Sequence, residues 1–149
     1  RATLTTEGDD LPDALARRLR AKTLHGVYVT PTFDTWADWP LDPADGLWGG
    51  EPAANLLTNY LRPGVLTIYA KRLPPMLMAK QRMTRADAQA NRVLEWRKPF
   101  WGQLPAGPRP DVVPPVLVYA DLLATGDGRC IETANVLYEE TLAGTFPQG

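Results

Sequence analysis

The sequence predicts an α/β fold of the α+β kind: one domain, with a small sheet of about three strands covered by about five helices. Its length of 149 residues is sufficient for one domain with a hydrophobic core and too short for two domains of ordinary size. Short runs rich in β-branched and aromatic residues alternate with apolar patterns of helical period, and Pro and Gly separate them. Alternation of this kind favours a layer of helices on a sheet.

The N-terminal residues predict a flexible segment at 1–8, followed by the domain at 9–149. Residues 9–23 have the pattern of an amphipathic helix, because Leu11, Leu15 and Leu19 repeat every four residues. Acidic residues at its start and basic residues in its second half complement the helix dipole. The basic residues are Arg17, Arg18, Arg20 and Lys22.

Three short runs predict the strands of the sheet. They cover residues 27–30, 65–70 and 92–97, and the second is the clearest because it reads Val-Leu-Thr-Ile-Tyr-Ala. Residues 31–47 and 99–111 show no sustained period and contain several Pro residues, which predicts two loops. The tryptophans of the first loop indicate that it packs onto the body of the domain.

Two helices are predicted in the middle of the chain. The first follows Trp48-Gly49-Gly50, with Gly50 in a non-helical cap conformation and Glu51 in the first turn, and it ends at residues 62–64. The second opens at Pro74-Pro75 and runs to about Met83.

The stretch at residues 112–127 predicts a short, largely buried helix. Pro114-Pro115 suits its first turn and Gly126 its end, while Asp127 is placed to cap a final helix that runs to Ala143. Asp121 lies in the middle of this apolar run without a routine structural role. If it is buried it needs a partner, for which an arginine is the obvious candidate.

Composition excludes several kinds of site. A chain without serine has no Ser/His/Asp triad, and one Cys with one His makes neither a disulfide nor a Cys/His zinc cluster. We therefore expect no catalytic residue, no cofactor and no metal site. The absence of a long apolar run or a signal-like N-terminus predicts a cytoplasmic protein that does not bind membranes.

The charged residues have structural roles in this interpretation, but two functional alternatives remain open: a metal-dependent transfer centre and a surface that binds nucleic acid. Glu51, Asp121 and Asp127 would form a metal-dependent phosphoryl or nucleotidyl transfer centre if the two helix entries faced each other. The net charge of -1 argues against coating nucleic acid by charge alone, yet residues 71–98 hold eight basic residues. Together with Arg17, Arg18, Arg20 and Lys22, that cluster predicts a surface for phosphate backbone, in a DNA-binding accessory domain.

Four segments in order resemble the C-terminal domain of AbiEi-family antitoxins, which are DNA-binding regulators of type IV toxin-antitoxin systems. They lie at residues 19–24, 48–54, 60–69 and 114–127, and the resemblance spans residues 15–143. It implies a non-enzymatic domain that neutralises a nucleotidyltransferase-like toxin by binding. It also implies a winged helix-turn-helix upstream for promoter autoregulation, and no such pattern precedes residue 9.

On this resemblance the expected partner is the cognate toxin. The charged helix at residues 10–23 and the turn at residues 48–51 are the candidate partner surfaces, and the oligomeric state stays open. The candidate partner-binding residues are Trp48, Gly49, Gly50, Glu51, Asp121 and Asp127.

Overall fold

A five-stranded mixed sheet organises the computed structural model, which describes residues 23–102, 104 and 106–142. The strand order is β2-β3-β5-β1-β4. The strands are β1 (Leu24–Val29), β2 (Leu47–Gly49), β3 (Leu66–Tyr69), β4 (Thr84–Arg85) and β5 (Leu94–Arg97). Nearly all of the helix predicted at residues 9–23 lies outside the described residues.

The two central strands, β3 and β5, are parallel, with Ile68 opposite Trp96, and the other pairs are antiparallel. Both faces of β3 are buried, which explains its continuous apolar run. At one edge, Trp48 of β2 also bridges Val112 in parallel, so that the segment entering α4 covers this edge.

The α+β class is confirmed, but the expected number of about three strands is wrong for the described residues. Strands β1, β3 and β5 match the predicted ones to within a few residues. Strand β2 was missed because Leu47 falls in the predicted loop at 31–47 and Trp48-Gly49 in the predicted helix entry. Strand β4 was missed because Thr84 and Arg85 are both exposed and carry no apolar alternation. Both form only by pairing with a distant strand, which is not a local property of the sequence.

Four α-helices lie in the described residues: α2 (Gly50–Thr58), α3 (Pro75–Lys80), α4 (Pro115–Ala124) and α5 (Gly128–Leu137). A 3-10 helix, η1 (Phe33–Asp38), interrupts the predicted loop at 31–47, and a π-helical turn, η2 (Tyr138–Leu142), continues α5. Helices α2 and α3 end earlier than predicted. Asn59 adopts a left-handed φ of 58° after α2, and Arg82 a φ of 50° beyond α3.

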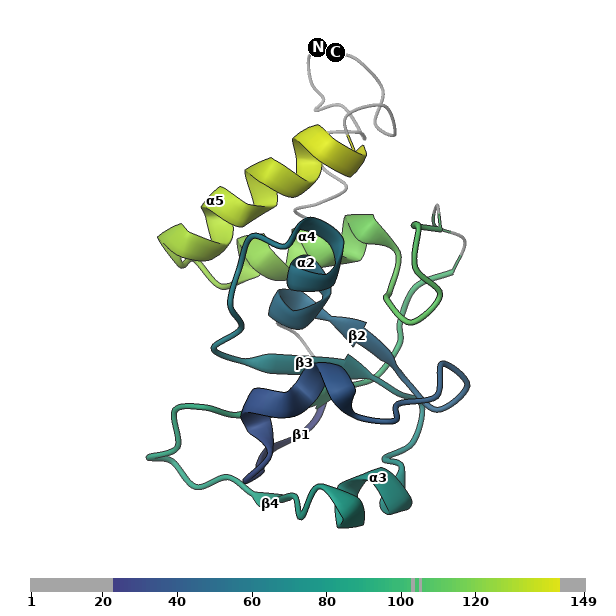
Figure 1. Ribbon diagram of the computed structural model, residues 1–149, viewed down its shortest axis with the longest axis vertical. Coiled ribbons are helices and arrows are strands. Elements are labelled where there is room, and N and C mark those ends of the chain that lie inside the picture. The colour runs from purple at the N-terminus through teal and green to yellow at the C-terminus, as the bar shows by residue number, and fades with distance from the viewer. Residues whose placement is uncertain (1–22, 103, 105, 143–149) are drawn as a thin grey trace.

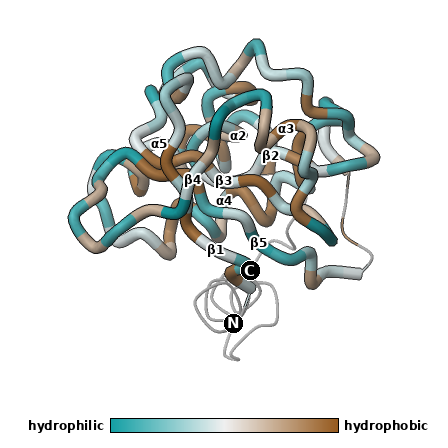
Figure 2. Tube along the Cα trace, turned by 90° about the horizontal axis from the view of Figure 1, so that it is seen from below, coloured by the Kyte–Doolittle hydropathy of each residue, from teal (hydrophilic) through white to brown (hydrophobic). Residues whose placement is uncertain are grey.

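Figure 1 shows α2, α4 and α5 on one side of the sheet, with α3 at the opposite end of the molecule. Helix α2 contacts β3, α4 and α5, so it lies between the sheet and the outer helices. The apolar segments gather around β3 and α4 in Figure 2, where the peripheral loops are mostly hydrophilic. The largest fully buried side chain is Trp96 of β5.

The tryptophans of the 31–47 segment anchor it to the core, as predicted. Trp36 packs edge-on against Trp48 at a centroid distance of 5.1 Å, and Trp39 lies 5.9 Å from the same ring. All three are buried.

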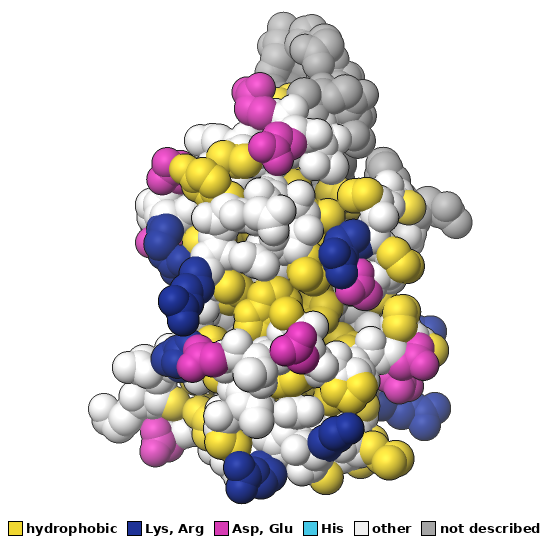
Figure 3. All heavy atoms as spheres, in the orientation of Figure 1, with side chains coloured by type: hydrophobic (Ala, Val, Ile, Leu, Met, Phe, Trp, Pro, Cys, Tyr) yellow, Lys and Arg dark blue, Asp and Glu magenta, His cyan; other side chains and the backbone are white. Residues whose placement is uncertain are grey.

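The surface in Figure 3 mixes Lys and Arg with Asp and Glu around a central area of hydrophobic side chains, so neither sign of charge dominates this face. Within the described residues, no helix has both the length and the apolar character that crossing a bilayer requires.

Candidate functional site

The turn between β2 and α2 is a buried junction of three elements. Helix α2 has its N-cap at Gly49, and the Gly50 N–H donates to the carboxylate of Asp121 in α4 at 2.7 Å. The other oxygen of Asp121 accepts from the Tyr69 hydroxyl of β3 at 2.8 Å. Asp121 therefore ties α4 to both the sheet and the start of α2.

The carboxylate of Asp121 accepts its hydrogen bonds from Gly50 and Tyr69 and not from the expected arginine. The positive charge of Arg97 nevertheless favours this carboxylate and acts to lower its pKa. The sequence places Tyr69 in a strand and Gly50 in a turn, and only the packing of α4 over both brings them to the carboxylate. Every residue except proline has a backbone N–H, so the sequence does not indicate that the Gly50 N–H is a partner of Asp121.

The close approach of the three elements requires both glycines. A Cβ on Gly49 would lie 2.5 Å from Cε1 of Tyr69 and 3.2 Å from Oδ2 of Asp121. Gly50 adopts a left-handed φ of 54°, and a Cβ there would lie 2.8 Å from the Thr67 hydroxyl. The predicted non-helical φ at Gly50 is confirmed, but the N-cap of α2 is Gly49 and not Gly50.

Glu51 anchors a second set of contacts. Its side chain is buried and accepts from the Gly64 N–H at 2.8 Å, after the loop that leaves α2. Arg129 in the first turn of α5 approaches the same oxygen to 3.5 Å and donates to the Arg62 carbonyl at 3.0 Å. Glu51 thus connects α2 to α5 and to the segment that enters β3.

Asp127 caps α5 as predicted, because its side chain accepts from the Arg129 N–H. Its carboxylate also lies 3.5 Å from Nη2 of Arg129, the nitrogen that faces Glu51. Glu51 and Asp127 consequently share one guanidinium, while Asp121 is held separately by Tyr69 and Gly50.

The three acidic residues are thus engaged in structural contacts rather than assembled around one point. Among the described residues, no group of three His, Cys, Asp or Glu side chains is arranged to hold a metal ion. This geometry does not support the hypothesis that the three residues form a metal-dependent phosphoryl or nucleotidyl transfer centre.

Burial sets the protonation of the junction. It raises the pKa of the Asp121 carboxyl to about 7, although the Tyr69 hydroxyl and the Gly50 N–H both favour the carboxylate. Burial and the Asp121 charge together raise the pKa of Tyr69 far above its ordinary value. Burial also raises the pKa of the Cys130 thiol to about 12, so its place in the first turn of α5 does not make it a reactive thiolate.

The raised pKa of Asp121 predicts how the stability of the fold changes with pH. The unfolded carboxyl ionises near its ordinary value of 3.8 and the folded one only near about 7, so over this window the folded state binds more protons. The contribution of Asp121 to the free energy of unfolding should therefore fall as pH rises from about 4 to about 7. We expect urea denaturation at about pH 5 and about pH 8 to show Asp121→Asn gaining stability relative to the parent chain as pH rises. Parallel pH profiles for the two chains would contradict this assignment.

The structure places the six predicted partner-binding residues close to this junction. Trp48, Gly49, Gly50 and Glu51 are buried, Asp121 is partly buried and Asp127 is exposed. Gly50, Glu51 and Asp121 also line a pocket of about 200 Å³, together with Thr67, Glu95 and Arg97. Contact of these residues with a partner stays a prediction.

The predicted nucleic-acid-binding residues Arg17, Arg18, Arg20 and Lys22 lie outside the described residues. The basic stretch at 71–98 does not form one free surface. Arg92 pairs with Asp34, Arg97 pairs with Glu95, and Arg85 lies over the Tyr28 ring. Within this stretch, the exposed cations whose side chains make no hydrogen bond or ion pair with another described residue are Lys71, Arg72, Lys80, Arg82 and Lys98.

Comparison with known proteins gives one result for nearly the whole chain. The family model described as a transcriptional regulator, the AbiEi antitoxin of a type IV toxin-antitoxin system, matches residues 11–143. Neither a curated protein nor a solved structure matches the chain. The matched range includes the Trp48–Glu51 turn, Asp121 and Asp127.

Proposed function

Because the chain belongs to the AbiEi antitoxin family of type IV toxin-antitoxin transcriptional regulators, we propose that it is the antitoxin-type domain of such a regulator and opposes its toxin by binding. The family match over residues 11–143 is the observation that carries this proposal. The family is regulatory and non-enzymatic. In the proposal the toxin is a nucleotidyltransferase-like enzyme, and the domain acts in the cytoplasm.

The geometry of the junction supports a role without catalysis. Both Asp121 oxygens accept hydrogen bonds from within the fold, and Glu51 accepts from a backbone N–H. Carboxylates held in this way orient helices. We propose that the Trp48–Glu51 turn contributes to partner binding indirectly, by fixing α2, α4 and the surface around them.

Promoter autoregulation in the full-length protein belongs to the same proposal. Promoter recognition is assigned to a winged helix-turn-helix upstream of this domain. The side chains of Lys71, Arg72 and Lys98, which form no ion pair within the described part of the chain, would give this domain at most an accessory contact with phosphate.

Growth rescue tests the antitoxin function. The chain, expressed together with the toxin encoded beside it, should restore growth that the toxin alone arrests. An inactivated toxin, which arrests nothing, provides the control for expression load. Failure to restore growth with the chain present at the level of the toxin would contradict the proposal.

A tagged chain then identifies what is bound. Co-purification of the toxin in salt of about 150 mM would support direct binding, as proposed. Rescue without co-purification would contradict direct binding and leave the antitoxin function standing, with its target elsewhere.

A further inference from the structure

A pocket of about 700 Å³ opens where the parallel strands β3 and β5 end. Lys71 and Arg72 follow β3, Pro99 and Trp101 follow β5, and the Pro43–Leu47 segment forms the opposite wall. In sheets with parallel strands, ligands bind in the crevice beyond the carboxyl ends of the strands, and this volume falls within the range of small-molecule sites. Neither the family match nor the predicted partner surface assigns a role to it.

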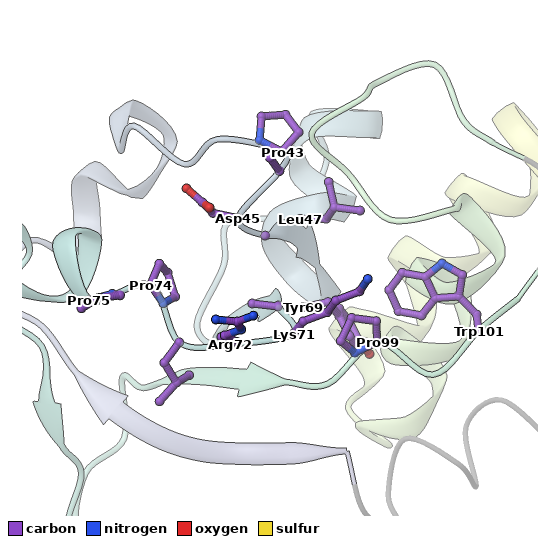
Figure 4. Close-up of a pocket in the computed structure, with 14 residues that line it drawn as sticks. Pro43, Asp45, Leu47, Tyr69, Lys71, Arg72, Pro74, Pro75, Pro99 and Trp101 are labelled. Atoms are coloured by element: carbon purple, nitrogen blue, oxygen red, sulfur yellow. The ribbon is translucent and has the colours of Figure 1, made fainter.

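Two cations enter this pocket from the end of β3. Lys71 and Arg72 are exposed, and neither makes an ion pair with another described residue. In Figure 4 the Lys71 amine points toward Trp101, while the Arg72 guanidinium lies between Tyr69 and Pro74. Positive charge is thus available at two places along the floor of the pocket, which suits an anionic ligand with more than one charged oxygen.

Trp101 supplies an aromatic wall beside Lys71. It is half-buried and meets the Tyr69 ring edge-on at a centroid distance of 5.2 Å and the Phe100 ring at 5.8 Å. Because these contacts hold the indole in place, it can present apolar surface to a planar ligand at little cost in side-chain entropy.

Asp45 lies on the opposite wall and accepts no hydrogen bond from another described side chain. The turn fixes its backbone, because its N–H and that of Gly46 donate to the Asp42 carbonyl at 2.8 and 3.1 Å. An exposed carboxylate at this position suits hydroxyl or amine donors and repels other carboxylates.

We propose that this pocket binds a nucleotide unit. Its phosphates contact Lys71 and Arg72, its base lies against Trp101, and its ribose hydroxyls or base amine donate to Asp45. A nucleotide carries all three kinds of group on one molecule, whereas an acidic peptide matches the two cations but has no planar base to lie against Trp101. The unit is either a free nucleotide or the end of a single-stranded nucleic acid. The proposal goes beyond the antitoxin function and does not rest on it.

Fluorescence anisotropy with the full chain tests the site. The probes are N-methylanthraniloyl GDP for free nucleotides and a fluorescein-labelled, 5′-phosphorylated oligothymidylate for strand ends, each in about 50 mM and about 300 mM salt. We expect saturable binding of at least one probe, weakened by salt. Preference between the probes identifies the source of the nucleotide.

Matched substitutions locate the binding. Lys71→Ala together with Arg72→Ala should weaken binding by about 10-fold or more, and Trp101→Ala by roughly 5- to 100-fold. Trp101→Phe should keep most of the affinity. Lys80→Ala and Tyr60→Ala change an exposed cation and an exposed aromatic residue outside the pocket, and should leave binding unchanged.

Three results would overturn the proposal: no saturable binding of either probe, equal losses in the pocket and control variants, or displacement by poly-glutamate as effective as by unlabelled nucleotide. The last would show that the site recognises acidic peptide. Growth rescue measures the antitoxin function separately, so failure of one proposal leaves the other intact.

Discussion

Asp121→Ala is expected to lower the free energy of unfolding by about 2–4 kcal/mol. The change leaves the buried Gly50 N–H without its acceptor and removes the partner of the Tyr69 hydroxyl, whose residue is only 1% exposed. It also opens a small cavity between α4 and the turn. Urea denaturation at about pH 5, where the parent carboxyl is protonated and carries no buried charge, measures the loss.

Asp121→Asn is the matched control for that change. The amide oxygen can accept from the Gly50 N–H, and the amide nitrogen can donate to the Tyr69 hydroxyl oxygen, so both contacts are kept without a charge and the second runs in the opposite direction. At about pH 5, where the parent carboxyl is protonated in the folded state, we expect a change within about 1 kcal/mol of the parent chain. A loss as large as that of Asp121→Ala would show that the carboxyl group itself, rather than these hydrogen bonds, holds the junction.

Gly49→Ala is expected to destabilise the domain by about 3 kcal/mol. The new Cβ would lie 2.5 and 2.8 Å from two carbons of the Tyr69 ring. That ring cannot yield easily, because Asp121 holds its hydroxyl and Trp101 packs against it. Thermal or urea denaturation measures the effect.

Gly128→Ala is the appropriate control, since nothing lies within 4 Å of a Cβ there and the residue begins α5. It should be neutral or slightly stabilising. Equal stability of Gly49→Ala and Gly128→Ala would mean that Tyr69 does not occupy the position that the junction requires.

The parts of the fold that could be predicted are those with local causes. Asp127 and the Pro114-Pro115 pair mark the starts of α5 and α4 through capping and first-turn preferences that act over a few residues. Strand β3 was recognisable because four consecutive buried positions leave a continuous apolar run. The start of α2 was placed to within about a residue for similar reasons, since glycine adopts the positive φ of Gly50 without strain.

The missed features depend on contacts between distant residues. Strand β2 exists because Leu47, Trp48 and Gly49 pair with β3, and β4 because two exposed residues pair with β1. The partners of Asp121 lie 52 and 71 residues away in the sequence. The pocket beyond β3 and β5 joins three separate segments, so its cations and its aromatic wall could not be associated before the topology was known.

We infer that the polar groups at the junction of α2, α4 and β3 position the helices of this domain and do not react. Growth rescue by Asp121→Asn, beside the parent chain and Asp121→Ala, tests this most directly. We expect Asp121→Asn to fold and to restore growth as fully as the parent, and Asp121→Ala to rescue less in proportion to its loss of folded protein. A folded Asp121→Asn chain that no longer opposes the toxin would contradict the account, because it would show that the function needs the carboxylate itself.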